Sequence, residues 1–246
     1  MIMAIKDRAS QEIDVFKEIF QTKSGKILFS VPVLLTFYRY YGSTEFFDRA
    51  LLSFFQGNSS VPFFSILYFF FSSFFFLFVV PIFIITVILK ERLGEYGVGW
   101  GEKTAGLAII GVLFPVIAVI FLLPASRLPS FLSEYPLFHQ AGERLSILIL
   151  YELSYGFYYL SWEFFFRGYM LFGTKDTLGP ANSILIQTIP STLMHIGKPD
   201  GEIWSAILAG LVFGAIALKT RSIFYVFLLH WFIGITLDVF ILVGAG

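Results

Sequence analysis

Long apolar stretches without a charged side chain are the feature that most constrains this chain. Residues 61–89 contain no Asp, Glu, Lys or Arg, and neither do residues 105–123. A helix of about 20 such residues spans the hydrocarbon core of a bilayer. The 246 residues are 57% hydrophobic and only 14% charged, whereas a soluble domain carries about 25% charged residues. We therefore expect an all-α, polytopic transmembrane helix bundle.

About seven apolar segments are candidate spans. They cover residues 27–41, 61–89, 105–123, 145–173, 181–196, 203–218 and 222–243. Ahead of them, residues 5–21 place Ile13, Phe16, Ile19 and Phe20 on one helical stripe. This stripe predicts an amphipathic helix at the membrane interface, with an ordinary solvated helix as the alternative.

The distribution of positive charge predicts the orientation. With seven spans and a cytoplasmic N-terminus, eleven Lys or Arg lie on the cytoplasmic side and four on the opposite side. The eleven are Lys6, Arg8, Lys17, Lys23, Lys26, Lys90, Arg92, Lys103, Lys175, Lys219 and Arg221, and the four are Arg49, Arg127, Arg144 and Lys198. Cytoplasmic loops carry the excess of Lys and Arg. We expect a multi-pass protein of a bacterial inner membrane, with a cytoplasmic segment 1–26, N-terminal helices and loops in 27–140, and a transmembrane core in 141–246.

Composition also excludes several classes of function. The formal net charge is zero and the basic residues are dispersed, so no nucleic-acid partner is expected. Cysteine is absent, which excludes disulfides, thiolate metal sites and a cysteine nucleophile.

Ionisable side chains nevertheless lie within the C-terminal spans, at Glu163, Arg167, His195, His230 and Asp238. Each charge costs roughly 2.5–3.5 kcal/mol at a helix centre on insertion scales, so each needs a reason. The first two are four residues apart and share a helix face, where they can pair. A self-neutralising ion pair and hydrogen-bonded packing histidines are the structural alternative.

Three of these groups reach similar depths on different helices. At about 1.5 Å per residue, Glu163, His195 and His230 lie roughly 15, 21 and 12 Å from the cytoplasmic ends of their spans. We therefore expect them to line one polar cavity, with Arg167 beside Glu163.

Such a cavity suits hydrolysis. A carboxylate and a histidine can deprotonate water, and a second histidine can donate a hydrogen bond to the oxyanion that forms on a peptide carbonyl. Glu163, His195 and His230 could instead hold zinc. Since the His-Glu-x-x-His spacing is missing, no metal or other cofactor is expected.

At these residues the sequence resembles the CPBP intramembrane proteases, the CAAX-prenyl-protease, bacteriocin-processing and Abi-like group, over roughly residues 145–243. The likeness rests on three motifs, which are Glu163-Phe-Phe-Phe-Arg167-Gly168, His195 followed by Gly197-Lys198-Pro199 and Glu202, and Ala209-Gly210-Leu-Val-Phe-Gly214 leading to Ser222 and His230. The resemblance implies a glutamate-dependent intramembrane endopeptidase. It implies that Glu163 and His195 activate water, that His230 stabilises the oxyanion and that Arg167 orients Glu163.

The motifs depart from the family pattern at three positions. Trp162 stands where the family has the first of two glutamates, Ser191 where it has phenylalanine, and Gly234 where it has asparagine. Family mechanisms tend to give water activation to the missing glutamate, so Glu163 is either the base or its arginine-paired support. Asp238, as a partner for His230, and Glu202 are secondary candidates.

Peptide or protein substrates, prenylated or membrane-embedded, and the lipid bilayer are the expected partners. Two other functions stay open. The first is a catalytically inactive membrane scaffold, immunity or maturation factor on the same fold. The second is a proton-coupled transporter, because acid and histidine clusters also serve proton relays.

Overall fold

The computed structural model describes residues 16–17, 19–55, 57 and 60–244, and in this part of the chain all regular structure is helical. The long helical segments, some of which change between α- and π-geometry, are α2 (Lys23–Tyr41), α4–η2–α5–η3 (Val61–Phe74, Phe75–Val79, Val80–Phe83, Ile84–Leu89), α6–η5–α7 (Lys103–Ile117, Ala118–Leu122, Leu123–Ala125), α9–η7–α10 (Leu145–Glu163, Phe164–Phe172, Gly173–Leu178), α11 (Pro180–Leu193), α12 (Asp200–Thr220) and α13 (Phe224–Gly244). The shorter ones are α3 (Thr44–Ala50), η1 (Leu52–Phe55), η4 (Leu93–Tyr96), α8 (Pro129–Glu134) and η6 (His139–Glu143).

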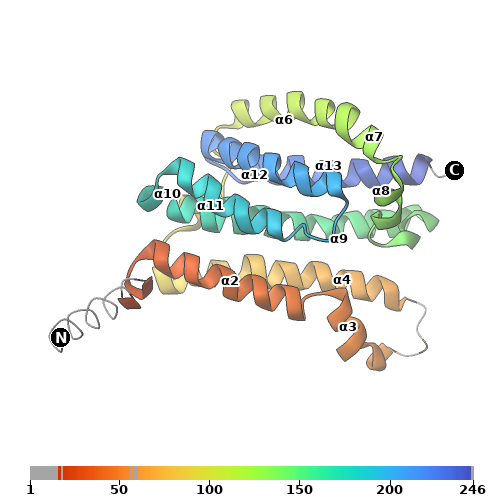
Figure 1. Cartoon of the computed structure of the whole chain (residues 1–246), viewed down its shortest axis with the longest axis horizontal. Helices are drawn as coiled ribbons and strands as arrows, with labels where there is room; N and C mark the ends of the chain where they lie inside the picture. The colour runs from red at the N-terminus through yellow and green to blue at the C-terminus, as the bar shows by residue number, and fades with distance from the viewer. Residues whose placement is uncertain (1–15, 18, 56, 58–59, 245–246) are drawn as a thin grey trace, which may run out of the picture.

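The helices form layers around α9 and α11 (Figure 1). On one side, α4 packs along α9 and α2 contacts α10. On the other side lie α12 and α13, and α6 covers α13. The helix that begins at α9 therefore runs through the centre of the bundle, where every side chain from Ser161 to Thr174 is buried.

Helix α12 approaches α11 closely because small residues face it. A Cβ added to Gly210 would lie 2.6 Å from Thr188, and one added to Gly214 would lie 3.1 Å from Ile184. Gln187 spans the same contact, since its side-chain amide donates to the Gly210 carbonyl at 2.8 Å. Small residues at this spacing let helix backbones approach in membranes, and here they fix α12 beside α11.

The all-α fold class is confirmed, while the number of spans is not. Four helices of the described residues are long and apolar enough to cross a membrane, namely Val61–Leu89, Lys103–Ala125, Asp200–Thr220 and Phe224–Gly244. The prediction of about seven is therefore not confirmed. The predicted amphipathic helix at 5–21 falls mostly outside the described residues.

Two glycines of α6 differ sharply in their surroundings, which provides a test of the packing of α6 on α13. A Cβ at Gly106 would lie 2.5 Å from the ring of Tyr225, whose hydroxyl is held at 2.6 Å by the Trp100 carbonyl, whereas Gly111 faces open space. Gly106→Ala should destabilise the protein by about 1–3 kcal/mol through overpacking. Gly111→Ala should be neutral, or stabilising by up to about 1 kcal/mol through helix propensity.

Unfolding of both variants in mixed micelles measures the difference. Equal stability of the two variants would contradict the described approach of α6 to Tyr225.

Candidate active site

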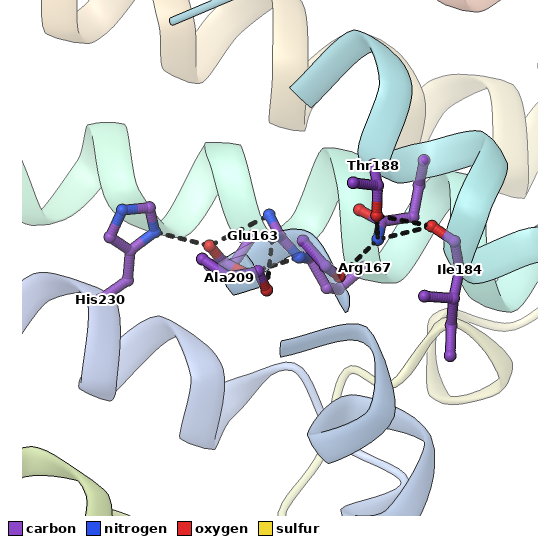
Figure 2. A network of polar contacts seen from close by, with 8 residues as sticks. Glu163, Arg167, Ile184, Thr188, Ala209 and His230 are labelled. Carbon is purple, nitrogen blue, oxygen red and sulfur yellow. Dashed lines mark hydrogen bonds and ion pairs between the residues drawn. The ribbon is translucent and has the colours of Figure 1, made fainter. Parts of the chain in front are cut away.

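The carboxylate of Glu163 lies at the centre of the site and has no exposure to solvent. Arg167, one helical turn further on, places Nη1 3.3 Å from Oε1 and Nε 3.3 Å from Oε2 of Glu163 (Figure 2). The guanidinium also reaches the Ala209 carbonyl of α12, at 3.4 Å, and lies over the ring of Phe213. A buried charge must be paired and hydrogen-bonded. The spacing predicts the charge pairing, and Nη1 donates to Oε1, whereas Nε and Oε2 form an ion pair without a hydrogen bond.

Arg167 lies in a nine-residue π-helical segment, η7, that begins directly after Glu163. π-Helical turns inside α-helices are found mostly at functional sites. Gly168 allows the close packing of this segment, since a Cβ there would lie 2.9 Å from the Phe164 ring and 3.1 Å from the Tyr96 carbonyl.

His230, on α13, binds the same carboxylate. Its Nδ1 lies 2.6 Å from Oε1 of Glu163 (Figure 2). A carboxylate oxygen that accepts this hydrogen bond requires a proton on Nδ1. Nε2 is therefore the ring nitrogen that remains for other chemistry. The rings of Tyr159 and Phe213 contact the imidazole, with centroid distances of 4.7 and 5.6 Å, and limit its rotation.

His195 is held in the same tautomer by a different partner. It lies in the turn that follows α11, and its Nδ1 is 2.7 Å from the Ser191 carbonyl. A carbonyl only accepts, so Nδ1 carries the proton and Nε2 keeps its lone pair. The indole of Trp162 contacts the imidazole edge-to-face at 5.2 Å. The position where the resembled family has a glutamate is thus filled by a ring that packs on His195.

Both histidines line one cavity of about 50 Å³. Its other polar and aromatic walls are Lys198, Glu202, Tyr135, Tyr155, Tyr158, Tyr159 and Trp162. A water needs about 10–15 Å³ by this measure, so the cavity accommodates a few waters. Glu163 is not among the lining residues, so the prediction that it lines this cavity is wrong. It is fully buried, bound to His230 and paired with Arg167, whereas His195 and His230 lie at the cavity.

The C-terminal part of the chain matches a known protein family. Residues 145–236 match the family model of Rce1-like type II CAAX prenyl endopeptidases. Residues 145–236 are similar to this family and are called the Rce1-like segment below. The match includes all four residues described above and confirms the resemblance drawn from the motifs. No curated protein and no solved structure matches the chain.

Glu202 is the secondary candidate that reaches the cavity of the Rce1-like segment. It lies in the first turn of α12, and its Oε2 accepts a hydrogen bond of 2.6 Å from the hydroxyl of Tyr135. Burial and then the Glu202 carboxylate raise the pKa of Tyr135 well above its ordinary value, so the phenol stays protonated and donates. The neighbouring Lys198 pairs instead with Glu134, at 2.6 Å.

Asp238 is not the partner of His230, which corrects the prediction made for it. Its Oδ2 accepts a hydrogen bond of 3.1 Å from Tyr151, and its side chain interacts with Glu152. It does not line the cavity. Two helical turns separate Asp238 from His230 along α13. Asp238 therefore faces Tyr151 and Glu152 of α9, whereas Nδ1 of His230 donates to Glu163.

Sequence reasoning missed the tyrosines of the Rce1-like segment. Tyr155, Tyr158 and Tyr159 line the cavity from α9, and the Tyr159 hydroxyl occupies the space beside Gly234, where an added Cβ would lie 2.2 Å from it. The run of tyrosines at residues 151–159 was the available signal, but in a sequence with 20% aromatic residues it does not stand out.

The structure does not support the zinc alternative with a set of ligands. Among the described residues, no three His, Cys, Asp or Glu side chains are placed to hold a metal ion. In the set proposed for zinc, Oε1 of Glu163 is already bound to Nδ1 of His230. The absence of a cofactor stays a prediction.

Arg167→Met tests the buried ion pair. It leaves the Glu163 carboxylate in the bundle without its counter-charge, and breaking a buried pair in this way costs about 3–5 kcal/mol. Adding Glu163→Gln to the same chain should recover part of the loss, because the orphaned charge is then gone. Unfolding in mixed micelles gives both values, and Arg144→Met, at an exposed position, is the control. A double variant no more stable than Arg167→Met would argue against the pairing.

Proposed function

We propose that the chain is an intramembrane peptide hydrolase that acts on membrane-associated peptides or proteins. The observation that carries the proposal is that His195, in the turn after α11, and His230, on α13, line one small cavity while hydrogen bonds fix their Nδ1 atoms. The Rce1-like match, to a family of endopeptidases, supports the same reaction class. Substrates with prenylated or membrane-embedded ends are proposed on that match.

In the proposed reaction, a water held by Nε2 of His195 attacks the peptide carbonyl. As the water oxygen bonds to the carbonyl carbon, one O–H bond of the water breaks, its proton passes to a base in the cavity, and the carbonyl electron pair moves onto oxygen. His230, in the form that carries protons on both nitrogens, donates Nδ1–H to Glu163 and Nε2–H to this oxyanion. Preorganised donors of this kind are usually the largest single contribution to such reactions. Collapse of the intermediate breaks the C–N bond, and the proton from water leaves with the amine.

Glu163 and Arg167 act through His230 in this scheme. The carboxylate is fully buried and touches Nδ1 rather than the cavity, so it fixes the tautomer and direction of the imidazole as the carboxylate of a catalytic triad does. Arg167 holds the carboxylate in place. Glu163 is thus a positioning residue, which differs from the water-activating role inferred from the motif alone.

The four apolar helices and the family match indicate an integral membrane protein. We propose the cytoplasmic N-terminus and the bacterial inner membrane on the charge distribution of the loops. The cavity then lies within the bilayer and is reached by substrates that are already membrane-bound.

The proposed function predicts that His195→Ala, His230→Ala and Glu163→Gln prevent cleavage while the proteins still insert. The measurement is a membrane peptidome comparison of cells that carry each form at equal levels. We expect the same precursors to accumulate with all three variants and at least a 100-fold loss of their products, consistent with removal of acid–base groups. His139→Ala is the matched control, since His139 is the third histidine of the chain and is exposed.

Peptidomes of the three variants that match the wild type would contradict the proposed hydrolysis. That outcome would favour the scaffold or maturation role, which does not need the histidines to act on a substrate.

Chelation provides a separate test of the cofactor prediction. The proposed mechanism uses two histidines and water, so exhaustive dialysis of the purified protein against EDTA should leave the cleavage rate unchanged. The substrate is an internally quenched peptide that spans a cleavage site from the peptidome comparison. Loss of activity that Zn²⁺ restores would contradict the metal-free reaction.

A further inference from the structure

Among the described residues that line the cavity, one has a carboxylate, Glu202 of the second motif, to which the proposed function gives no role. It shares this cavity with His195 and His230, which the proposed function places at the reacting atoms. The waters that this cavity accommodates are therefore bounded by Glu202 as well as by the two histidines.

Glu163 itself does not line the cavity, so its carboxylate does not act on these waters. It has no exposed surface, its Oε1 is bound by His230 and its Oε2 lies against Arg167. The neighbouring position is Trp162, whose indole fills the space beside His195. The motif region of α9 and η7 thus presents no carboxylate to the cavity, so a carboxylate that acts on the water beside Nε2 of His195 must come from another part of the lining.

The Glu202 carboxylate is held in place through one of its two oxygens. Tyr135 donates a 2.6 Å hydrogen bond to Oε2 from outside α12, which leaves Oε1 as the oxygen that Tyr135 does not bind. The first turn of a helix favours negative charge through the helix dipole, which opposes the cost of placing a carboxylate in the cavity. The one nearby ammonium group, that of Lys198, is engaged by Glu134, so it does not neutralise Glu202 through a direct contact.

We propose that Glu202 is the catalytic base that takes the proton from the attacking water, with Tyr135 as its positioning residue. This inference rests on the proposed function. As the water oxygen bonds to the carbonyl carbon, one O–H bond of water breaks and the proton passes to Oε1 of Glu202. When the C–N bond breaks, the same proton passes to the departing nitrogen, which restores the carboxylate and releases an amine and an acid.

The test uses the full-length purified protein and the internally quenched peptide described above. Glu202→Gln should lower kcat by about 100- to 10,000-fold, the range for a positioned general base, with KM changed less than threefold. Tyr135→Phe should lower kcat by about tenfold, because it removes the bond that holds the carboxylate. Asp200→Asn, an exposed acid in the same helical turn, should keep the wild-type rate.

Chemical rescue separates catalysis from a structural role. Glu202→Ala leaves space for a small carboxylate, so added formate should raise its kcat at least tenfold and leave Asp200→Asn and His195→Ala unchanged. A structural role would predict no response to formate, as would loss of folding in the variant.

The outcomes distinguish the two proposals. Near-wild-type kcat in Glu202→Gln, or no formate response in Glu202→Ala, with His195→Ala inactive, overturns the role of Glu202 and leaves the hydrolase intact. Peptide cleavage that is unaffected by His195→Ala, or that is absent from the wild type, overturns the proposed function and the role of Glu202 together.

Discussion

The burial of one carboxylate determines the geometry of the site. An isolated charge in a low-dielectric interior costs far more than a helical bundle can tolerate, so Glu163 must be paired and hydrogen-bonded. Arg167 provides the counter-charge from the same helix and His230 provides a hydrogen bond from α13. Because both groups converge on one carboxylate, the direction of the His230 ring follows from the electrostatics of Glu163.

The packing of the helices turns this local pair into a cavity. The small residues Gly210 and Gly214 bring α12 against α11, which places Phe213 against both Arg167 and His230. The same approach sets the first turn of α12, with Glu202, beside the turn that carries His195. An aromatic wall from α9 then closes the space, so the polar groups face a few waters rather than lipid.

Helical periodicity and the free-energy cost of placing charges in a membrane span predicted much of the site from the sequence. The i, i+4 spacing of Glu163 and Arg167 predicted their contact. The depths of Glu163, His195 and His230 along their spans predicted one shared cavity, which His195 and His230 line and Glu163 does not. The candidate spans agree closely with the helical segments of the structure, but only four meet the length and hydropathy of a membrane span. Helix length and apolar runs are local properties, and a sequence expresses them directly.

The remaining features depend on contacts between distant parts of the chain. Tyr135 and Glu202 are 67 residues apart and Tyr151 and Asp238 are 87 apart, so no periodic pattern links them. Asp238 looked available to His230 along one helix, yet α9 provides it with another partner. In the sequence, Trp162 is notable only because it replaces a glutamate of the family motif. The packing shows that its ring occupies the space beside His195.

The hydrogen bond between Glu163 and His230 is the central claim, and ¹⁵N NMR of the protein labelled at histidine tests it most directly. The chain has three histidines, so substitution assigns each signal. We predict that Nδ1 of both His195 and His230 carries a fixed proton and that exposed His139 gives averaged, solvent-exchanging signals. Glu163→Gln should shift the His230 signals and leave those of His195 in place. A His230 ring that exchanges like His139, or that does not respond to Glu163→Gln, would contradict the account.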